Sequence, residues 1–329
     1  MAPLVIRSAQ DAIAAVPYLL GFHPSRSLVV IGFEGRDHGT CAIRLDLPAA
    51  EAAGRVAALL AANGFTRSLL LGYGPAAEVA ESAAPVRAAL SSAGVPAAEA
   101  IRVADGRWWS LTCHDDCCPP EGTPYDISAS VVAARATFAG HVALADRAEL
   151  VRSVQPLEGP VRTAMRRATA RAERRRLARV PSPATAGEDV AYLLALLTRA
   201  RNGSPPTDDE VARLGILLTD LRLRDEAWIR IDEEAPAADI AFWRDVLRRV
   251  EDAYAPAPAS LLAFAAYSTG DGGLANVALQ RALDADPGYS MAAILREVIN
   301  AGIPPSQLRL RMTSDQLAAA YDDPPQKAS

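Results

Sequence analysis

Cysteine is scarce in this chain, with four residues in 329, and aromatic side chains make up only 5% of it. Four cysteines in a chain of this length are too few for a disulfide framework. With so few aromatic rings, the hydrophobic core has to be built mainly from Ala, Val and Leu. Lysine is almost missing too, since Lys327 is the only one and arginine carries the rest of the positive charge.

Long apolar runs are also absent, because no segment reaches the roughly 18 residues that a membrane-spanning helix needs. Arg7 and Asp11 interrupt any apolar run before Ala12–Leu20, so we expect no signal peptide, no membrane partner and a cytoplasmic location. The formal net charge of −5 argues against a general nucleic-acid binder, whose domain is usually basic. The length predicts two domains rather than one core.

Residues 1–155 are expected to form an α/β domain. Continuous apolar strands imply burial on both sheet faces, so we predict a mixed sheet with flanking helices in a layered sandwich. Cys117–Pro124 is predicted to be an irregular loop throughout. In chain order the expected elements are a helix ending at Leu20, strands Ser27–Phe33 and Thr40–Leu47 as a hairpin, helix Glu51–Asn63, strand Ser68–Gly72, helix Ala76–Ala93, strands Ala100–Val103 and Arg107–Thr112, and helices Ile127–Gly140 and Asp146–Ser153.

A basic segment separates this domain from the rest. Residues 161–180 hold eight arginines and one glutamate, and their pattern predicts a helix that Pro181-Ser182-Pro183 ends. We therefore place a basic helical connector at 156–185. Such a helix either binds polyanions or neutralises the protein's own acidic surface, for instance Asp232-Glu233-Glu234. Self-neutralisation is the commoner arrangement.

Residues 186–310 are predicted to form an all-α domain, followed by a C-terminal tail at 311–329. Helices are expected at Glu188–Arg201, after the capping box of Thr207 and Glu210, and at Ile240–Tyr254. Ser260–Tyr289 is similar to one tetratricopeptide-type (TPR-like) hairpin, because small residues sit where that repeat brings two helices together. These residues are Ala263, Ala275 and Ala282, with Pro287 following them.

Three of the four cysteines fall within six residues. Cys113, His114, Cys117 and Cys118 have ligand types that bind zinc. A structural zinc site normally takes a second ligand pair from a distant segment, and Cys41 is the only other cysteine. We therefore expect no cofactor and a packed loop stiffened by prolines, with zinc as the alternative.

Seven residues are candidates for ligand binding on one side of the α/β domain. The chemistry they offer is proton exchange by histidine, anion binding by arginine and by glycine-turn amides, and stacking by tryptophan. Each also has a plain structural interpretation as a turn, a helix cap or core. In that interpretation Trp108 and Trp109 are both buried, and Arg107 pairs with Asp105 or Asp126. The seven are His23, Arg26, Gly72, Gly74, Asp105, Arg107 and Trp108.

Several stretches resemble the actinobacterial family of unknown function DUF4192. They are Ala15–Pro24 (AVPYLLGFHP), Arg102–Trp109 (RVADGRWW), Cys117–Pro124 (CCPPEGTP) and Ser260–Ser290. The resemblance covers most of the chain and implies an actinobacterial cytoplasmic protein, but it implies no activity. In that family more residues separate the first cysteine from the cysteine pair, which weakens the zinc interpretation.

The sequence contains no nucleophile elbow, no H-E-x-x-H zinc motif and no EF-hand loop. We therefore expect a non-enzymatic binding or scaffold protein whose helical domain receives another protein. One alternative is a small-molecule sensor or enzyme that uses the side of the α/β domain bearing His23, Arg26, Asp105 and Arg107. Another is docking to nucleic acid through residues 161–180, although we do not expect nucleic acid to be the main partner.

Overall fold

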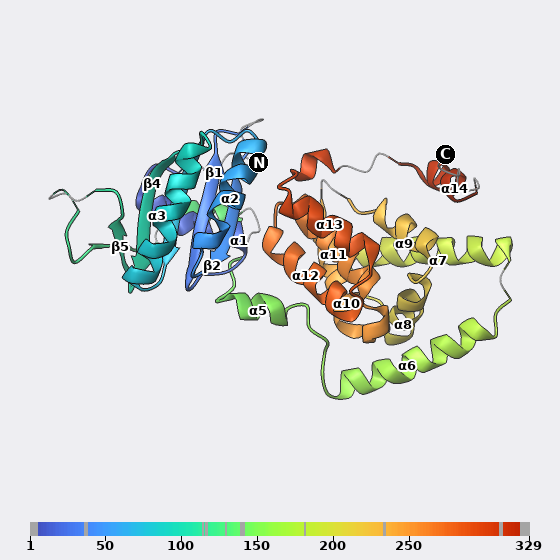
Figure 1. The fold of residues 1–329 in the computed structure, drawn as a ribbon. Helices are drawn as coiled ribbons and strands as arrows, with labels where there is room; N and C mark the ends of the chain where they lie inside the picture. The colour runs from blue at the N-terminus through green and yellow to red at the C-terminus, as the bar shows by residue number, and fades with distance from the viewer. Residues whose placement is uncertain are drawn as a thin grey trace. The chain divides into compact units, whose positions relative to one another are not determined.

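The computed structural model describes residues 6–35, 39–113, 115, 118–128, 130–138, 142–180, 182–232, 235–308 and 312–322. The chain forms two compact units, which are described separately (Figure 1). Unit 1 contains residues 1–150 and 301–303, and unit 2 contains residues 151–300 and 304–329. Within the described residues, no helix has both the length and the apolar character needed to cross a membrane.

Unit 1 is built around a six-stranded sheet with the strand order β2-β1-β3-β4-β5-β6. Only β3 and β4 pair in parallel, and every other neighbouring pair is antiparallel. The mixed sheet and the β1–β2 hairpin are therefore confirmed. The strands are β1 Ser27–Phe33, β2 Cys41–Asp46, β3 Arg67–Tyr73, β4 Ala97–Ala104, β5 Arg107–Ser110 and β6 Thr123–Pro124.

Both faces of this sheet are covered. Helices α2 (Ala53–Ala62) and α3 (Ala76–Ser92) pack on the face that carries Leu28, Val30 and Leu70. Strand alternation turns Val29 and Leu71 to the opposite face, and both are buried. Helix α1 (Ala9–Leu20) packs with α4 (Val131–Phe138) in a second apolar cluster. A short helix, α5 (Arg147–Arg152), contains the boundary between the two units, which falls after Leu150.

Unit 2 is helical throughout its described residues, apart from its connections. Helix α11 lies at its centre, because every residue from Pro256 to Ala266 is buried. It forms a hairpin with α12 in which Ala263, Ala275 and Ala282 are fully buried. That this hairpin is a TPR-like repeat stays a prediction. The helices are α6 Pro160–Leu177, α7 Pro183–Arg201, α8 Asp208–Leu217, α9 Leu221–Trp228, α10 Ala237–Arg249, α11 Pro256–Ser268, α12 Gly272–Ala285, α13 Ser290–Asn300 and α14 Ser314–Asp322.

Two predicted boundaries were wrong for identifiable reasons. Helix α7 begins at Pro183 rather than Glu188, because Ser182 and Thr185 form a capping box and proline is well tolerated in a first turn. The segment Cys117–Pro124 is not irregular throughout, since Thr123 and Pro124 pair with β5 as strand β6. Proline is compatible with β6 because this strand lies at the edge of the sheet.

Candidate ligand site beside the cysteine loop

The hairpin of β4 and β5 provides the frame of the candidate site. Asp105 and Gly106 both have positive φ values, 50° and 71°, as the tight turns of two-residue hairpins require. Strand β6 pairs with only two residues of β5, Arg107 and Trp108. Among the described residues no strand pairs with the outer edge of β5 beyond Trp108. Leu111 still donates a backbone hydrogen bond to Ala100 of β4 at 2.8 Å, and the loop that follows extends away from the sheet (Figure 1).

Two side chains of β5 hold this loop against the strand. The Arg107 guanidinium donates hydrogen bonds to the carbonyl oxygens of Gly122 at 2.8 Å and Glu121 at 3.4 Å. The Trp109 indole N–H donates to the carbonyl oxygen of Pro120 at 3.0 Å. The predicted pairing of Arg107 with Asp105 or Asp126 is therefore wrong. A guanidinium offers five donors, and the nearby loop backbone supplies acceptors for them.

A cavity of about 300 Å³ lies between β5 and the loop. This volume is at the lower end of the range for small-molecule sites. Its described lining combines indole rings, hydroxyls, thiols and proline rings, and contains no carboxylate, imidazole or cationic group. The lining residues are Trp108, Trp109, Ser110, Cys113, Cys118, Pro119, Pro120 and Thr123.

The two tryptophans point to opposite faces of the sheet, as strand alternation predicts, since Trp108 pairs with Val103 and Trp109 with Arg102. The Arg102 guanidinium lies 4.3 Å from the Trp109 ring centroid and donates to the Gly74 carbonyl oxygen at 2.9 Å. Trp108 has no ring or cation contact among the described residues. Both indoles are half-buried, so the expected buried pair was wrong. The reason is the short β6, which leaves this part of the sheet edge open.

The cysteine loop brings two described thiols to the cavity. Cys113 and Cys118 are half-buried and not in disulfide bonds, and the Cys113 thiol lies 3.8 Å from a carboxylate oxygen of Asp115. His114 and Cys117 lie outside the described residues. Within the described residues, no three side chains of metal-binding type come together. Cys41 cannot join this loop, because β2 is the opposite edge strand of the sheet. The zinc alternative gains no support from these contacts.

Of the seven predicted ligand residues, only Trp108 lines the cavity. Arg26 forms hydrogen bonds to both carboxylate oxygens of Glu78 at 2.9 Å, and His23 is exposed. The structure gives Gly72 a packing role, because a Cβ there would lie only 2.2 Å from a methyl carbon of Val79 in α3.

The remaining residues of this set have other positions. Gly74 accepts the Arg102 hydrogen bond, Asp105 forms the hairpin turn, and Arg107 fastens the loop. Arg102 was missed in the sequence. The signal that could have found it is its position, because this charged residue lies between two apolar strand residues, Ile101 and Val103, that are both buried.

Two residues with buried hydroxyls are paired between the neighbouring strands β1 and β3. Ser27 in β1 pairs with Tyr73 in β3, and neither hydroxyl has a hydrogen-bond partner among the described residues. Burial raises the pKa of the Tyr73 phenol far above its ordinary value, and neighbouring Tyr125 adds to the effect. An unpaired buried hydroxyl destabilises the folded state, because it has lost its hydrogen bonds to water.

Replacing Tyr73 by phenylalanine is therefore expected to raise the free energy of unfolding by about 1 kcal/mol. The matched control is Tyr254→Phe, whose hydroxyl donates to Glu173 at 2.7 Å and whose removal should lower stability. Thermal unfolding of both variants by calorimetry measures the difference. A Tyr73→Phe protein that melts at a lower temperature than the native chain would contradict the interpretation of an unpaired hydroxyl.

The fold and the site together define a protein with an α/β unit that carries a ligand-sized cavity at its sheet edge, followed by a helical unit. The family model described as "Domain of unknown function (DUF4192)" matches residues 10–306. The chain belongs to this family, as its motifs indicated. No curated protein and no solved structure matches it.

Proposed function

We propose that the protein acts by binding, and that its α/β unit takes a small, flat, uncharged molecule into the cavity beside β5. The observation that carries this proposal is the half-buried Trp108, which lines the cavity without a ring or cation contact among the described residues. Indole rings favour stacking on other planar rings. Trp109 is less available, because Arg102 already covers one of its faces.

The chemistry of the lining supports a neutral ligand and a binding role. Ser110 and Thr123 supply hydroxyls for hydrogen bonds, and the proline rings supply apolar walls. A charged ligand would find no counter-ion among the described lining residues. The described lining residues do not include a histidine, since His23 lies elsewhere in unit 1.

The test is titration calorimetry of the full chain with adenosine and nicotinamide as planar probes and cyclohexanol as a non-planar one. We expect heat from at least one planar probe and none from cyclohexanol. Trp108→Leu should weaken that binding roughly fivefold or more, because an aromatic stacking contact contributes about 1 kcal/mol beyond its buried area. The bound probe should also slow alkylation of Cys113 and Cys118, which line the same cavity.

Trp228→Leu serves as the control, since Trp228 is also half-buried but belongs to α9 of unit 2. Its binding should match that of the native chain. Equal affinity of native and Trp108→Leu proteins, or the absence of heat with every planar probe, would overturn the proposal.

A further inference from the structure

Helix α6 separates its apolar and basic residues onto different faces. Met165, Ala168 and Ala172 are buried on the inner face, and α6 packs there on α8. The outer face carries Arg167, Arg171, Arg174 and Arg175. The last three follow Arg167 by 4, 7 and 8 residues, which is the spacing of side chains on one side of a helix. Glu173 is the only acidic residue of α6.

The expected self-neutralisation is only partial. Five arginines of the segment 161–180 form ion pairs with acidic residues of unit 2. Arg167, Arg174 and Arg175 are exposed and have no ion pair among the described residues. These five arginines make seven ion pairs: Arg162 with Glu251 and Asp252, Arg166 with Glu251, Arg171 with Asp209, Arg176 with Asp189, and Arg179 with Glu188 and Asp189.

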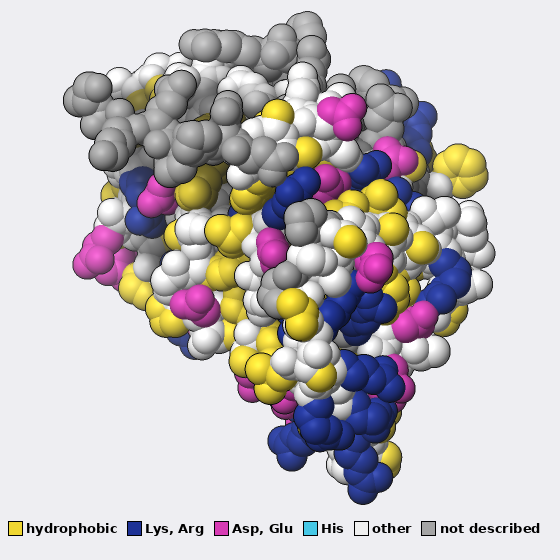
Figure 2. Space-filling view, turned by 90° about the vertical axis from the view of Figure 1, so that its right-hand side faces the viewer, with side chains coloured by type: hydrophobic (Ala, Val, Ile, Leu, Met, Phe, Trp, Pro, Cys, Tyr) yellow, Lys and Arg dark blue, Asp and Glu magenta, His cyan; other side chains and the backbone are white. Residues whose placement is uncertain are grey.

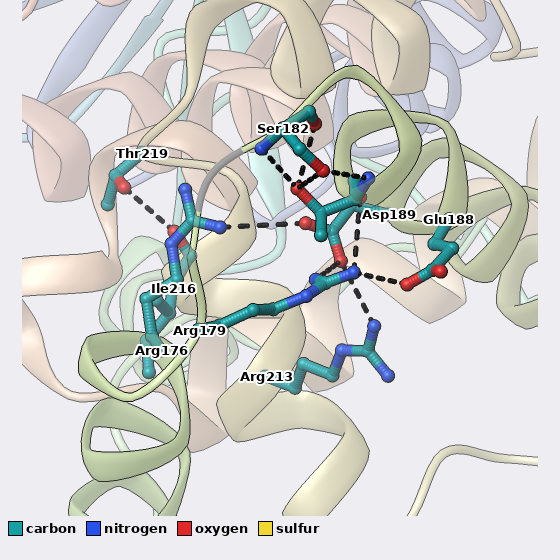
Figure 3. A network of polar contacts seen from close by, with 9 residues as sticks. Arg176, Arg179, Ser182, Glu188, Asp189, Arg213, Ile216 and Thr219 are labelled. Atoms are coloured by element: carbon teal, nitrogen blue, oxygen red, sulfur yellow. Dashed lines mark hydrogen bonds and ion pairs between the residues drawn. The ribbon is translucent and has the colours of Figure 1, made fainter.

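The C-terminal end of α6 has an excess of positive charge around one carboxylate (Figure 3). Asp189 is buried, with a side chain only 3% exposed, and three guanidiniums lie within 3.5 Å of its oxygens. They belong to Arg176, Arg179 and Arg213. Asp189 orients these three arginines, and Glu188 pairs with Arg179 as well. The two carboxylates therefore leave one of the three positive charges unbalanced. Arg213 is further fixed by stacking on the Tyr192 ring at 3.7 Å.

These guanidiniums remain accessible at the surface. The side chains of Arg176 and Arg213 are 43% and 42% exposed, and dark-blue side chains gather at the lower end of the face in Figure 2. From Arg167 to Arg175 the helix rises about 12 Å. One strand of duplex nucleic acid carries a charge about every 3.4 Å along its axis, so this row can face about three phosphates.

We propose that the outer face of α6 and the turn that follows it, from Arg167 to Arg179, dock on the phosphodiester backbone of nucleic acid. Arginine forks match phosphate oxygens in paired hydrogen bonds. Although Asp209 pairs with Arg171 within this row, Arg167, Arg174 and Arg175 have no ion pair among the described residues and keep their full charge for phosphate. An anionic membrane fits less well, because the apolar face that a surface-bound helix inserts into lipid is buried here against unit 2. Among the described residues near the row, the strongly exposed aliphatic ones are Leu177 and Val180.

The experiment measures fluorescence anisotropy of a labelled DNA duplex, and of its separated single strand, with the full chain at increasing salt. Binding is expected at about 50 mM salt. The logarithm of the association constant should fall linearly with the logarithm of the salt concentration. The variant R167Q/R174Q/R175Q should bind at least tenfold more weakly. The slope of the logarithm of its association constant against the logarithm of salt concentration should be smaller in magnitude by about 2–3. Comparison of the two probes shows which form of backbone is preferred.

The control variant R7Q/R55Q/R147Q removes the same charge from exposed arginines of unit 1 that have no ion pair among the described residues. It should bind as the native chain does. Absence of binding at low salt would overturn the proposal, as would equal losses in the two triple variants. Binding to vesicles of phosphatidylcholine and phosphatidylserine, without binding to either DNA probe, would assign the face to membranes instead.

Discussion

Replacing Arg201 by alanine is expected to lower the free energy of unfolding by about 3–5 kcal/mol. The Arg201 guanidinium at the end of α7 donates to both carboxylate oxygens of Asp239, at 3.0 and 2.8 Å. Asp239 is 1% exposed, and its remaining described hydrogen bond comes from the Asp232 amide at 2.9 Å. Without Arg201 the carboxylate would stay buried with no cation beside it.

Chemical denaturation of unit 2, followed by its helical signal, measures this loss. Arg199→Ala is the matched control from the same helix. Its partner Glu210 is 2.7 Å away, but the two side chains are 45% and 23% exposed, and such surface pairs contribute at most about 1 kcal/mol. A loss below about 1 kcal/mol for Arg201→Ala would show that water reaches Asp239.

Gly122→Ala is expected to destabilise unit 1 by about 2–5 kcal/mol and to distort the cavity. Gly122 has φ +78°, a region that costs other residues about 1–2 kcal/mol. A Cβ there would lie 2.4 Å from the Trp109 ring, so the indole has to move and its hydrogen bond to Pro120 is lost. Crowding of this kind costs a further 1–3 kcal/mol or so. Thermal unfolding and near-ultraviolet circular dichroism report the two effects.

The control for this prediction is Gly106→Ala in the neighbouring hairpin turn. Gly106 has a similar φ of +71°, but a Cβ there would meet nothing within 4 Å. The stability difference between the two variants therefore isolates the contact with Trp109. If both variants lose the same stability, the ring has room to move and the cavity wall is softer than the structure indicates.

Much of unit 1 was predictable because its strands follow simple hydrophobic patterns. Ser27–Phe33 is an unbroken apolar run with the bounds of β1, and the glycines after α1 and before β4 end helices with positive φ. The cavity was harder to predict, because it depends on how far β6 pairs along β5. That length is set by contacts of the loop with Arg107 and Trp109, which no local pattern encodes.

The ion pairs of the charged residues were also hard to predict from local sequence patterns. Eight arginines in 161–180 are plain in the sequence, but several of their partners are distant in the chain: Asp209, Glu251 and Asp252 lie tens of residues away. Which arginines remain unpaired therefore depends on how α6 packs on its neighbours. Helix α9 was missed altogether, since Leu221–Trp228 alternates charged and apolar residues over too short a span for a clear helical period.

The complete burial of α11 bears on how unit 2 comes apart. In a stacked repeat protein each hairpin contacts only its neighbours, and the ends can fray one repeat at a time. Helix α11 instead contacts α9, α10, α12 and α13, so its backbone amides reach solvent only when most of the unit opens. The amide hydrogens from Ala259 to Ala266 should therefore exchange with deuterium last in unit 2, at rates set by its global unfolding.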